Sequence, residues 1–265
     1  MLDYKVLLVL FIYVKMSSSY LAYLNINDAI DELYGNIIDG KYSQAVKLTR
    51  NISDTNNHGV FHHGMIAHVV EKLAQEMNPN ILSYGYKLWS SGEKEIVKKY
   101  LPNSFPLIFD ENDVILMDRQ YNLALKLDVN IDSAGDRKVW GDSRDKTSRR
   151  VIWKVLPIWE NSKVHFKLKN LDCNQFLKMG LYPDGIKDRP VYGDNKHDEM
   201  RHTWYLDPVF LNGKYSFFIR NRQFGQKLKL AVKEDSYKDR RLWGHYGDIN
   251  DNDLPRFLWD IVKHE

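Results

Sequence analysis

The sequence predicts an α+β protein in which a helical N-terminal part precedes a strand-rich C-terminal part. From Asn27 to about Pro106, apolar residues recur at helical spacing. From about residue 112 onwards they alternate as in half-buried strands, and this half repeats itself three times. Because helices first and strands afterwards indicate segregated units, we expect two domains, a helical one over 20–111 and an all-β one over 112–265.

The helical half contains five apolar stripes, each of which predicts one helix. The first starts after Asn27 and Asp28 as capping candidates and stops at Gly40. The third ends at Asn78-Pro79, and the last reaches Pro102. The residues that define the stripes fall into five groups: Ile30, Leu33, Tyr34, Ile37 and Ile38; Tyr42, Ala45, Val46 and Thr49; Ile66, Val69, Val70, Leu73 and Met77; Ile81, Tyr84, Leu88 and Trp89; Ile96, Val97, Tyr100 and Leu101.

Three similar units follow one another in the C-terminal half. Two large apolar residues around a lysine recur at intervals of 52 and 51 residues, in Leu125-Lys126-Leu127, Leu177-Lys178-Met179 and Leu228-Lys229-Leu230. A tryptophan closes each unit, at Trp153, Trp204 and Trp259. A unit of about 50 residues has room for about four short strands and cannot bury its apolar face alone. Because closure removes exposed strand edges, the repeat predicts a three-fold closed sheet of the β-trefoil type.

The first 19 residues resemble a secretory signal peptide. An apolar run over 6–14 is too short to span a bilayer, and Ser17, Ser18 and Ser19 are small enough for cleavage after Ser19. We therefore expect a secreted, extracellular protein. The alternative is an uncleaved N-terminal arm that associates with a membrane surface. No later apolar run is long enough to form a transmembrane helix, so we do not expect an integral membrane protein.

Composition and motifs favour a non-enzymatic protein. The net charge of +3 gives no argument for a nucleic-acid partner, and the single Cys173 excludes an intramolecular disulfide. No phosphate-binding loop, dinucleotide fingerprint or nucleophile elbow is present. Four histidines gather in one segment, but no carboxylate completes a metal motif there, so we expect no metal and no cofactor. They are His58, His62, His63 and His68.

Each repeat also carries an Asp-Arg pair followed by an aromatic residue and a glycine, which admits two interpretations. In the structural one, the pair fixes a turn and the glycine permits a positive φ. In the functional one, an aromatic ring stacks on a saccharide and nearby carboxylates bind its hydroxyls, which gives Trp140, Asp142, Tyr192, Asp194 and Trp243. Ricin-like trefoil lectins place a Gln two residues before the closing Trp. This chain has Val151, His202 and Phe257 there, which argues against the usual lectin site.

One modification site can be read from the sequence. Asn51-Ile52-Ser53 is an acceptor sequon for N-glycosylation. The match is only three residues long, so occupancy of Asn51 is left open and depends on export of the chain.

Several segments, taken in order, closely resemble one known family. The resemblance covers roughly residues 25–265, and it indicates the 30 kDa low-molecular-mass lipoproteins of moth haemolymph, which include microvitellogenin. It is specific because it joins motifs in both halves of the chain. The matching segments are Tyr86-Lys87-Leu88-Trp89 with Gly92, Phe109 to Met117, Leu123-Ala124-Leu125, Trp140-Gly141-Asp142, Asp145-Lys146-Thr147-Ser148, Trp159-Glu160-Asn161, Lys163-Val164 to Asn170, and Trp204-Tyr205-Leu206 with Pro208.

The resemblance implies a VHS-like helical domain followed by a β-trefoil. It also implies a haemolymph storage protein that serves as a nutrient reservoir, is associated with lipid and is taken up by target tissues, where an uptake receptor is a possible partner. A saccharide-binding role in defence is the alternative. A lipid could occupy an apolar cavity among the helices, lined by residues such as Val69, Leu73 and Leu88, although these positions could equally be ordinary core.

Overall fold

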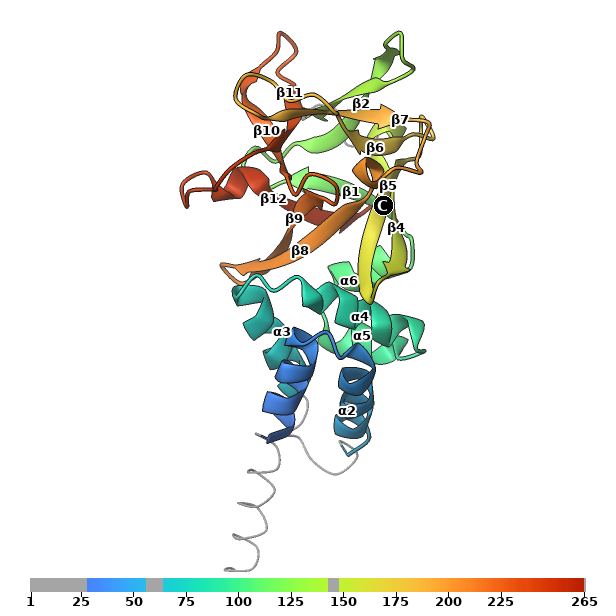
Figure 1. Cartoon of the computed structure of the whole chain (residues 1–265), viewed down its shortest axis with the longest axis vertical. Coiled ribbons are helices and arrows are strands. Elements are labelled where there is room, and N and C mark those ends of the chain that lie inside the picture. Colours follow the sequence, from blue (N-terminus) through green and yellow to red (C-terminus); the bar gives the residue numbers. More distant parts are fainter. Residues whose placement is uncertain (1–27, 56–63, 143–147, 265) are drawn as a thin grey trace, which may run out of the picture.

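The helices gather at one end of the molecule and the strands at the other (Figure 1). The computed structural model describes residues 28–55, 64–142 and 148–264. The expected signal peptide over 1–19 and the histidines His58, His62 and His63 lie outside these residues.

The helical part agrees with the five predicted stripes, except that Met77 lies beyond the third of these helices and is 50% exposed, and it adds one short helix. A helix over 28–38 comes first. It is followed by α2 (Tyr42–Thr55), α3 (Met65–Gln75), α4 (Asn80–Ser90), α5 (Lys94–Tyr100) and α6 (Ser104–Phe109). We did not predict α6, because Pro106 lies within it. Pro106 is in the first turn, where its missing N–H would have had no partner within the helix.

The described strands fall into three successive sets of four. The bounds of the first set are β1 (Asp113–Asp118), β2 (Ala124–Ile131), β3 (Arg137–Asp142) and β4 (Ile152–Glu160). The second set is β5 (Lys163–Asn170), β6 (Phe176–Met179), β7 (Arg189–Asp194) and β8 (Trp204–Leu211). The third set is β9 (Lys214–Asn221), β10 (Lys227–Glu234), β11 (Arg240–His245) and β12 (Leu258–Lys263). A short 3₁₀ helix precedes the fourth strand of each set, at Arg149–Val151, Met200–His202 and Leu254–Phe257.

The first and fourth strands of the sets close into a ring. In order, β1, β4, β5, β8, β9 and β12 are paired antiparallel with one another, and β12 pairs back to β1. The second and third strands form three hairpins, which join one another through β3–β7, β7–β11 and β11–β3. Each ring strand therefore has a partner on both sides.

The three closing tryptophans anchor the ring in the core. Trp153, Trp204 and Trp259 are fully buried. Their indole N–H groups donate to the backbone oxygens of Leu125 at 2.8 Å, Leu177 at 3.0 Å and Leu228 at 3.4 Å, respectively. Each tryptophan thus ties the fourth strand of its unit to the repeated Leu-Lys segment on the second strand, which explains why both features recur together in the sequence.

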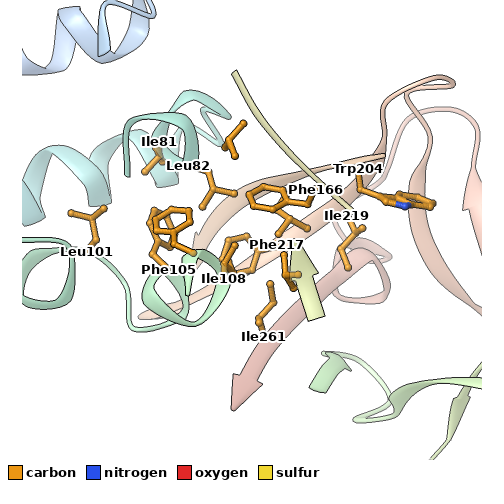
Figure 2. Packing of buried hydrophobic residues seen from close by; sticks show 14 of the residues in the cluster. Ile81, Leu82, Leu101, Phe105, Ile108, Phe166, Trp204, Phe217, Ile219 and Ile261 are labelled. Atoms are coloured by element: carbon orange, nitrogen blue, oxygen red, sulfur yellow. The ribbon is translucent and has the colours of Figure 1, made fainter. Parts of the chain in front are cut away.

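The helices and the sheet share one continuous hydrophobic core. Figure 2 shows Phe105 and Ile108 of α6 beside Phe217 and Ile261 of the ring. The centroids of the aromatic rings of Phe105 and Phe217 are 6.2 Å apart. On the same side of the sheet, α3 and α4 contact β8. The two parts predicted from the sequence are therefore packed together through buried aromatic and aliphatic side chains.

The glycine that follows each repeated aromatic residue serves a different purpose from the predicted one. Gly141, Gly193 and Gly244 do not have a positive φ, so that interpretation is wrong. A Cβ at Gly193 would lie 2.8 Å from Leu127 of the preceding repeat. A Cβ at Gly141 or Gly244 would lie even closer to Leu230 or Met179 of the neighbouring repeat, so glycine is needed for close packing between repeats.

Candidate functional site

The lysine of each repeated Leu-Lys segment lies inside the sheet. The side chain of Lys178 is 7% exposed, and its ammonium bridges Asp194 Oδ2 at 2.6 Å and Asp136 Oδ2 at 2.7 Å. Asp194 belongs to the same repeat as Lys178, whereas Asp136 belongs to the first repeat. The lysine therefore connects two repeats through buried charges.

The same bridge recurs around the molecule. Lys126 pairs with Asp142 of its own repeat and with Asp239 of the third repeat, whose Oδ2 is 3.1 Å from its Nζ. Lys229 pairs with Asp188 of the second repeat at 2.6 Å and contacts His245 Nδ1 of its own repeat at 2.9 Å. We call these three bridges the lysine ring; its members are Lys126, Lys178, Lys229, Asp136, Asp142, Asp188, Asp194, Asp239 and His245. The sequence pattern missed it, because alternation alone gives no reason to bury a lysine.

Two carboxylates of the lysine ring, Asp194 and Asp188, have pKa values below the ordinary value for aspartate. Burial alone would raise the pKa of Asp194, but the Lys178 ammonium, the Lys196 backbone N–H and His202 outweigh it and lower that pKa to about 2. Burial likewise opposes ionisation of Asp188, and Lys229 and the Tyr246 backbone N–H lower its pKa. Asp194 and Asp188 are therefore ionised at neutral pH, where they pair with lysine and cannot donate a proton.

The arginine of each Asp-Arg pair fixes a hairpin, as the structural interpretation expects. Arg137 donates through Nη1 to the backbone oxygens of Asp128, at 3.1 Å, and Val129. Arg189 donates in the same way to Leu181, and Arg240 to Val232. The neighbouring aspartates, Asp136, Asp188 and Asp239, belong to the lysine ring.

The three repeated aromatic residues come together on the strands that join the hairpins. Trp140, Tyr192 and Trp243 lie on β3, β7 and β11, and all three are partly buried. The guanidinium of Arg241 lies 5.4 Å from the centroid of Trp140 and 5.3 Å from that of Tyr192. Arg241 thus covers two of the three rings on which a saccharide was expected to stack.

The candidate saccharide residues therefore divide into two groups. The structure brings the three aromatic side chains to one part of the sheet. Asp142 and Asp194 are only 3% and 8% exposed. Each carboxylate is already paired with the ammonium group of a lysine, Lys126 or Lys178. Saccharide binding remains a prediction, and within it Trp243 is the aromatic residue that Arg241 does not cover.

The candidate lipid-cavity residues lie in the core. Val69 and Leu73 of α3 and Leu88 of α4 are at most 1% exposed and belong to the continuous hydrophobic cluster. None of them lines the two clefts described next. The first cleft, of about 120 Å³, lies at the junction of helices and sheet and is lined by Pro79, Asn80, Leu82, Ser83, Lys163, Val164, Tyr205, Leu206, Asp207 and Arg220.

The second cleft belongs to the third repeat and measures about 200 Å³. Its lining consists of Phe224, Gly225, Gln226, Lys227, His245, Tyr246 and Gly247. Pockets for drug-sized ligands usually measure about 300–1,000 Å³. Both clefts are therefore too small to enclose a lipid in the conformation described.

One buried carboxyl group differs from its counterparts in the other repeats. Asn170 and Asn221 occupy the same repeat position as Asp118, and each donates its side-chain N–H to backbone oxygens, at 2.8 Å and 2.9 Å. Asp118 is 1% exposed, and its Oδ2 has no hydrogen-bond partner among the described residues. Burial raises the pKa of Asp118 to about 7. A protonated Asp118 could donate as the two asparagines do.

The remaining candidate residues lie at the surface of the helices. Asn51 is exposed on α2, so a glycan there would not collide with the core. His68 is exposed on α3. Within 28–55, 64–142 and 148–264, no group of three metal-binding side chains is found, and no helix is long and apolar enough to cross a membrane.

Comparison with known proteins identifies the family. The model of the lepidopteran low molecular weight (30 kD) lipoproteins matches residues 27–263. The chain belongs to this family. The match extends over the helices and all three repeats, which confirms the resemblance recognised in the sequence.

Individual relatives agree with this assignment. The lipoprotein is 35% identical to low molecular mass lipoprotein 3 of Bombyx mori, over 84% of this chain and 86% of the relative. It is 37% identical to low molecular mass lipoprotein PBMHP-12 of the same species, over 84% and 83%. It is 35% identical to microvitellogenin of Manduca sexta, over 88% and 91%.

Proposed function

We propose that this lipoprotein is a secreted haemolymph storage protein that carries lipid and has no catalytic activity. Its membership of the lepidopteran lipoprotein family supports the proposal most strongly. The names of the matching relatives are those of lipoproteins and a microvitellogenin, and none of them names an enzyme. Uptake by target tissues through a receptor belongs to the same proposal.

The proposal includes the domain division. We infer a VHS-like helical domain over 20–111 and a β-trefoil of three repeats over 112–265, preceded by a signal peptide over 1–19. The closed ring of six strands and the three joined hairpins support a trefoil. The described helices, of which α3, α4 and α6 contact the ring strands, support the helical domain, although the shared core means that the two domains are not independent in stability.

The junction between helices and sheet is the place where we propose that lipid enters. The cleft between α4 and β8 opens onto Leu82, Val164 and Leu206, which are buried apolar side chains. A volume of about 120 Å³ does not hold an acyl chain. A bound lipid therefore requires α3 and α4 to separate from β8, which would give access to Val69, Leu73 and Leu88.

Native and denatured masses of the protein purified from haemolymph test the lipid proposal. We expect a native mass that exceeds the denatured mass by a few hundred daltons, with the excess recovered in an organic extract. The same denatured spectrum reports any glycan on Asn51 as a mass above that of the polypeptide. Equal native and denatured masses, together with an extract free of lipid, would contradict lipid carriage and leave storage alone.

The alternative function is saccharide recognition, and the second cleft favours it. This cleft is lined by the rings of Phe224 and Tyr246, beside the polar side chains of Gln226 and His245. Arg189 lies 4.0 Å from the centroid of Phe224 and Lys187 lies 5.0 Å from that of Tyr246, so a saccharide would share these rings with the two cations. Trp243, two residues before His245 on the same strand, faces the same side of the sheet. Aromatic stacking and a few polar groups are the usual means of holding a sugar ring.

Replacing Trp243 with alanine should weaken saccharide binding if this alternative is correct. Loss of the stacking surface should cost about 1 kcal/mol, which is about fivefold in the dissociation constant. The effect of Trp140→Ala should be smaller, because Arg241 already lies over that ring. Titration with a soluble glucan, with thermal unfolding as the check on folding, measures both effects. If both variants fold and bind the glucan as the parent does, the assignment of a saccharide site to these residues is wrong.

A further inference from the structure

The most exposed large apolar side chains of the described residues lie at the tips of the three hairpins. We define the hairpin crown as residues 129–136, 181–188 and 232–239. Its large apolar side chains are between 46% and 83% exposed, and they include the six most exposed in the described chain. They are Val129 and Ile131 on the first tip, Leu181, Tyr182 and Ile186 on the second, and Val232 and Tyr237 on the third.

The tips are held rigidly and in the same way. In each tip the first residue of a five-residue turn is an aspartate, Asp132, Asp184 or Asp235, whose side-chain Oδ1 accepts two backbone N–H groups of the turn. The arginine after each turn donates to the backbone oxygen of Val129, Leu181 or Val232. The exposed side chains are therefore presented by ordered turns, and flexibility does not account for their exposure.

The three-fold arrangement places the tips in one plane. Val129, Leu181 and Val232 occupy the same repeat position, and three equivalent points around an axis define a plane perpendicular to that axis. The β2–β3 and β10–β11 hairpins project from the end of the molecule opposite the helices (Figure 1). Three-fold equivalence places the β6–β7 tip at the same level along the axis, so all three tips can reach one flat surface while the helices point away from it.

The chemistry of the tips is that of segments that lie in a lipid–water interface. Aliphatic side chains and two tyrosines stand beside exposed lysines, Lys187, Lys233 and Lys238. Tyrosine rings and lysine stems suit the boundary between acyl chains and headgroups. The lysines are offset by the carboxylates of Asp132, Asp184 and Asp235, so apolar contact would supply most of the attraction.

We propose that the hairpin crown docks on a phospholipid surface by inserting its three tips into the headgroup region. Three separate apolar tips, presented by equivalent turns around one axis, fit an extended flat surface. Docking of this kind does not depend on whether the chain carries a lipid molecule of its own. The native-mass measurement therefore tests lipid carriage, and vesicle flotation separately tests docking.

Flotation of the full-length mature protein with phosphatidylcholine vesicles tests this inference. The test variant combines Val129→Glu, Leu181→Glu and Val232→Glu. A matched control makes the same change in charge at exposed apolar residues outside the crown, by Ile38→Glu, Met77→Glu and Val262→Glu. We expect the crown variant to lose at least tenfold in vesicle partitioning while the control keeps the parent value. Phosphatidylserine in the vesicles and added salt should both change binding little, because the lysines of the crown are offset by its carboxylates.

Three outcomes would overturn the proposal. The first is equal flotation of the crown variant and the parent protein. The second is an equal loss in the crown variant and the control, which would show that added charge alone is responsible. The third is a parent protein that does not float. If sedimentation velocity then shows a dimer that the crown variant cannot form, a second copy of the chain covers the crown in place of a lipid surface.

Discussion

Replacing Lys178 with alanine is expected to lower the free energy of unfolding by about 3–5 kcal/mol. The ammonium of Lys178 is the partner of two buried carboxylates, Asp136 and Asp194, and its removal takes their lysine counter-ion from both and leaves Asp194 with His202. The loss should appear as a lower midpoint in urea, measured by tryptophan fluorescence, because the Trp204 indole donates to Leu177 O, next to Lys178.

An exposed ion pair provides the matched control for Lys178→Ala. On α5, the Nζ atom of Lys98 lies 2.8 Å from Oε1 of Glu95, and both side chains are largely exposed. Lys98→Ala should therefore change the free energy of unfolding by less than about 1 kcal/mol. Similar losses in the two variants would contradict a structural role for the lysine ring.

Replacing Asp118 with asparagine is expected to stabilise the protein at alkaline pH and to have little effect in acid. Burial raises the pKa of Asp118 from the ordinary 3.8 to about 7. A group whose pKa is higher in the folded state stabilises that state below its unfolded pKa, and this stability is lost as the pH rises through the folded pKa. For Asp118 the window runs from about pH 4 to about pH 8.

The size of the Asp118 effect follows from the difference between the two pKa values. A pKa raised from 3.8 to about 7 corresponds to about 4 kcal/mol, which the parent protein loses across this window. Asp118→Asn carries no charge and supplies the side-chain N–H that Asn170 and Asn221 use in the other repeats. Denaturant unfolding of parent and variant across the pH window measures the difference, which isolates Asp118 from other titrating groups. A constant difference would contradict the assignment.

The fold was largely predictable because the sequence repeats the features that build it. The Leu-Lys segments, the Asp-Arg pairs and the closing tryptophans recur at fixed intervals, and each corresponds to one strand, turn or core anchor in every unit. Helix α6 was missed because its six residues include Pro106 and are too few to show a period. The close approach of Leu127 to Gly193 depends on how separate repeats pack, so no pattern within one repeat could indicate it.

The candidate sites were less predictable, because they depend on contacts between repeats. Spacing along the chain assigned Asp142 and Asp194 to a saccharide, whereas the structure pairs them with Lys126 and Lys178. The alternation of apolar residues gives no sign that a lysine is buried. A comparison of the repeats would have found one signal: asparagine replaces Asp118 in two of three copies, which indicates that the position needs a side-chain donor.

The most direct test of the proposed function is the N-terminus and abundance of the protein in cell-free haemolymph. Export and storage predict an abundant polypeptide that begins at Tyr20, after removal of residues 1–19. Mass spectrometry of the intact chain would show this directly. A protein that retains Met1 and is found only inside cells would contradict secretion, and with it the storage role proposed here.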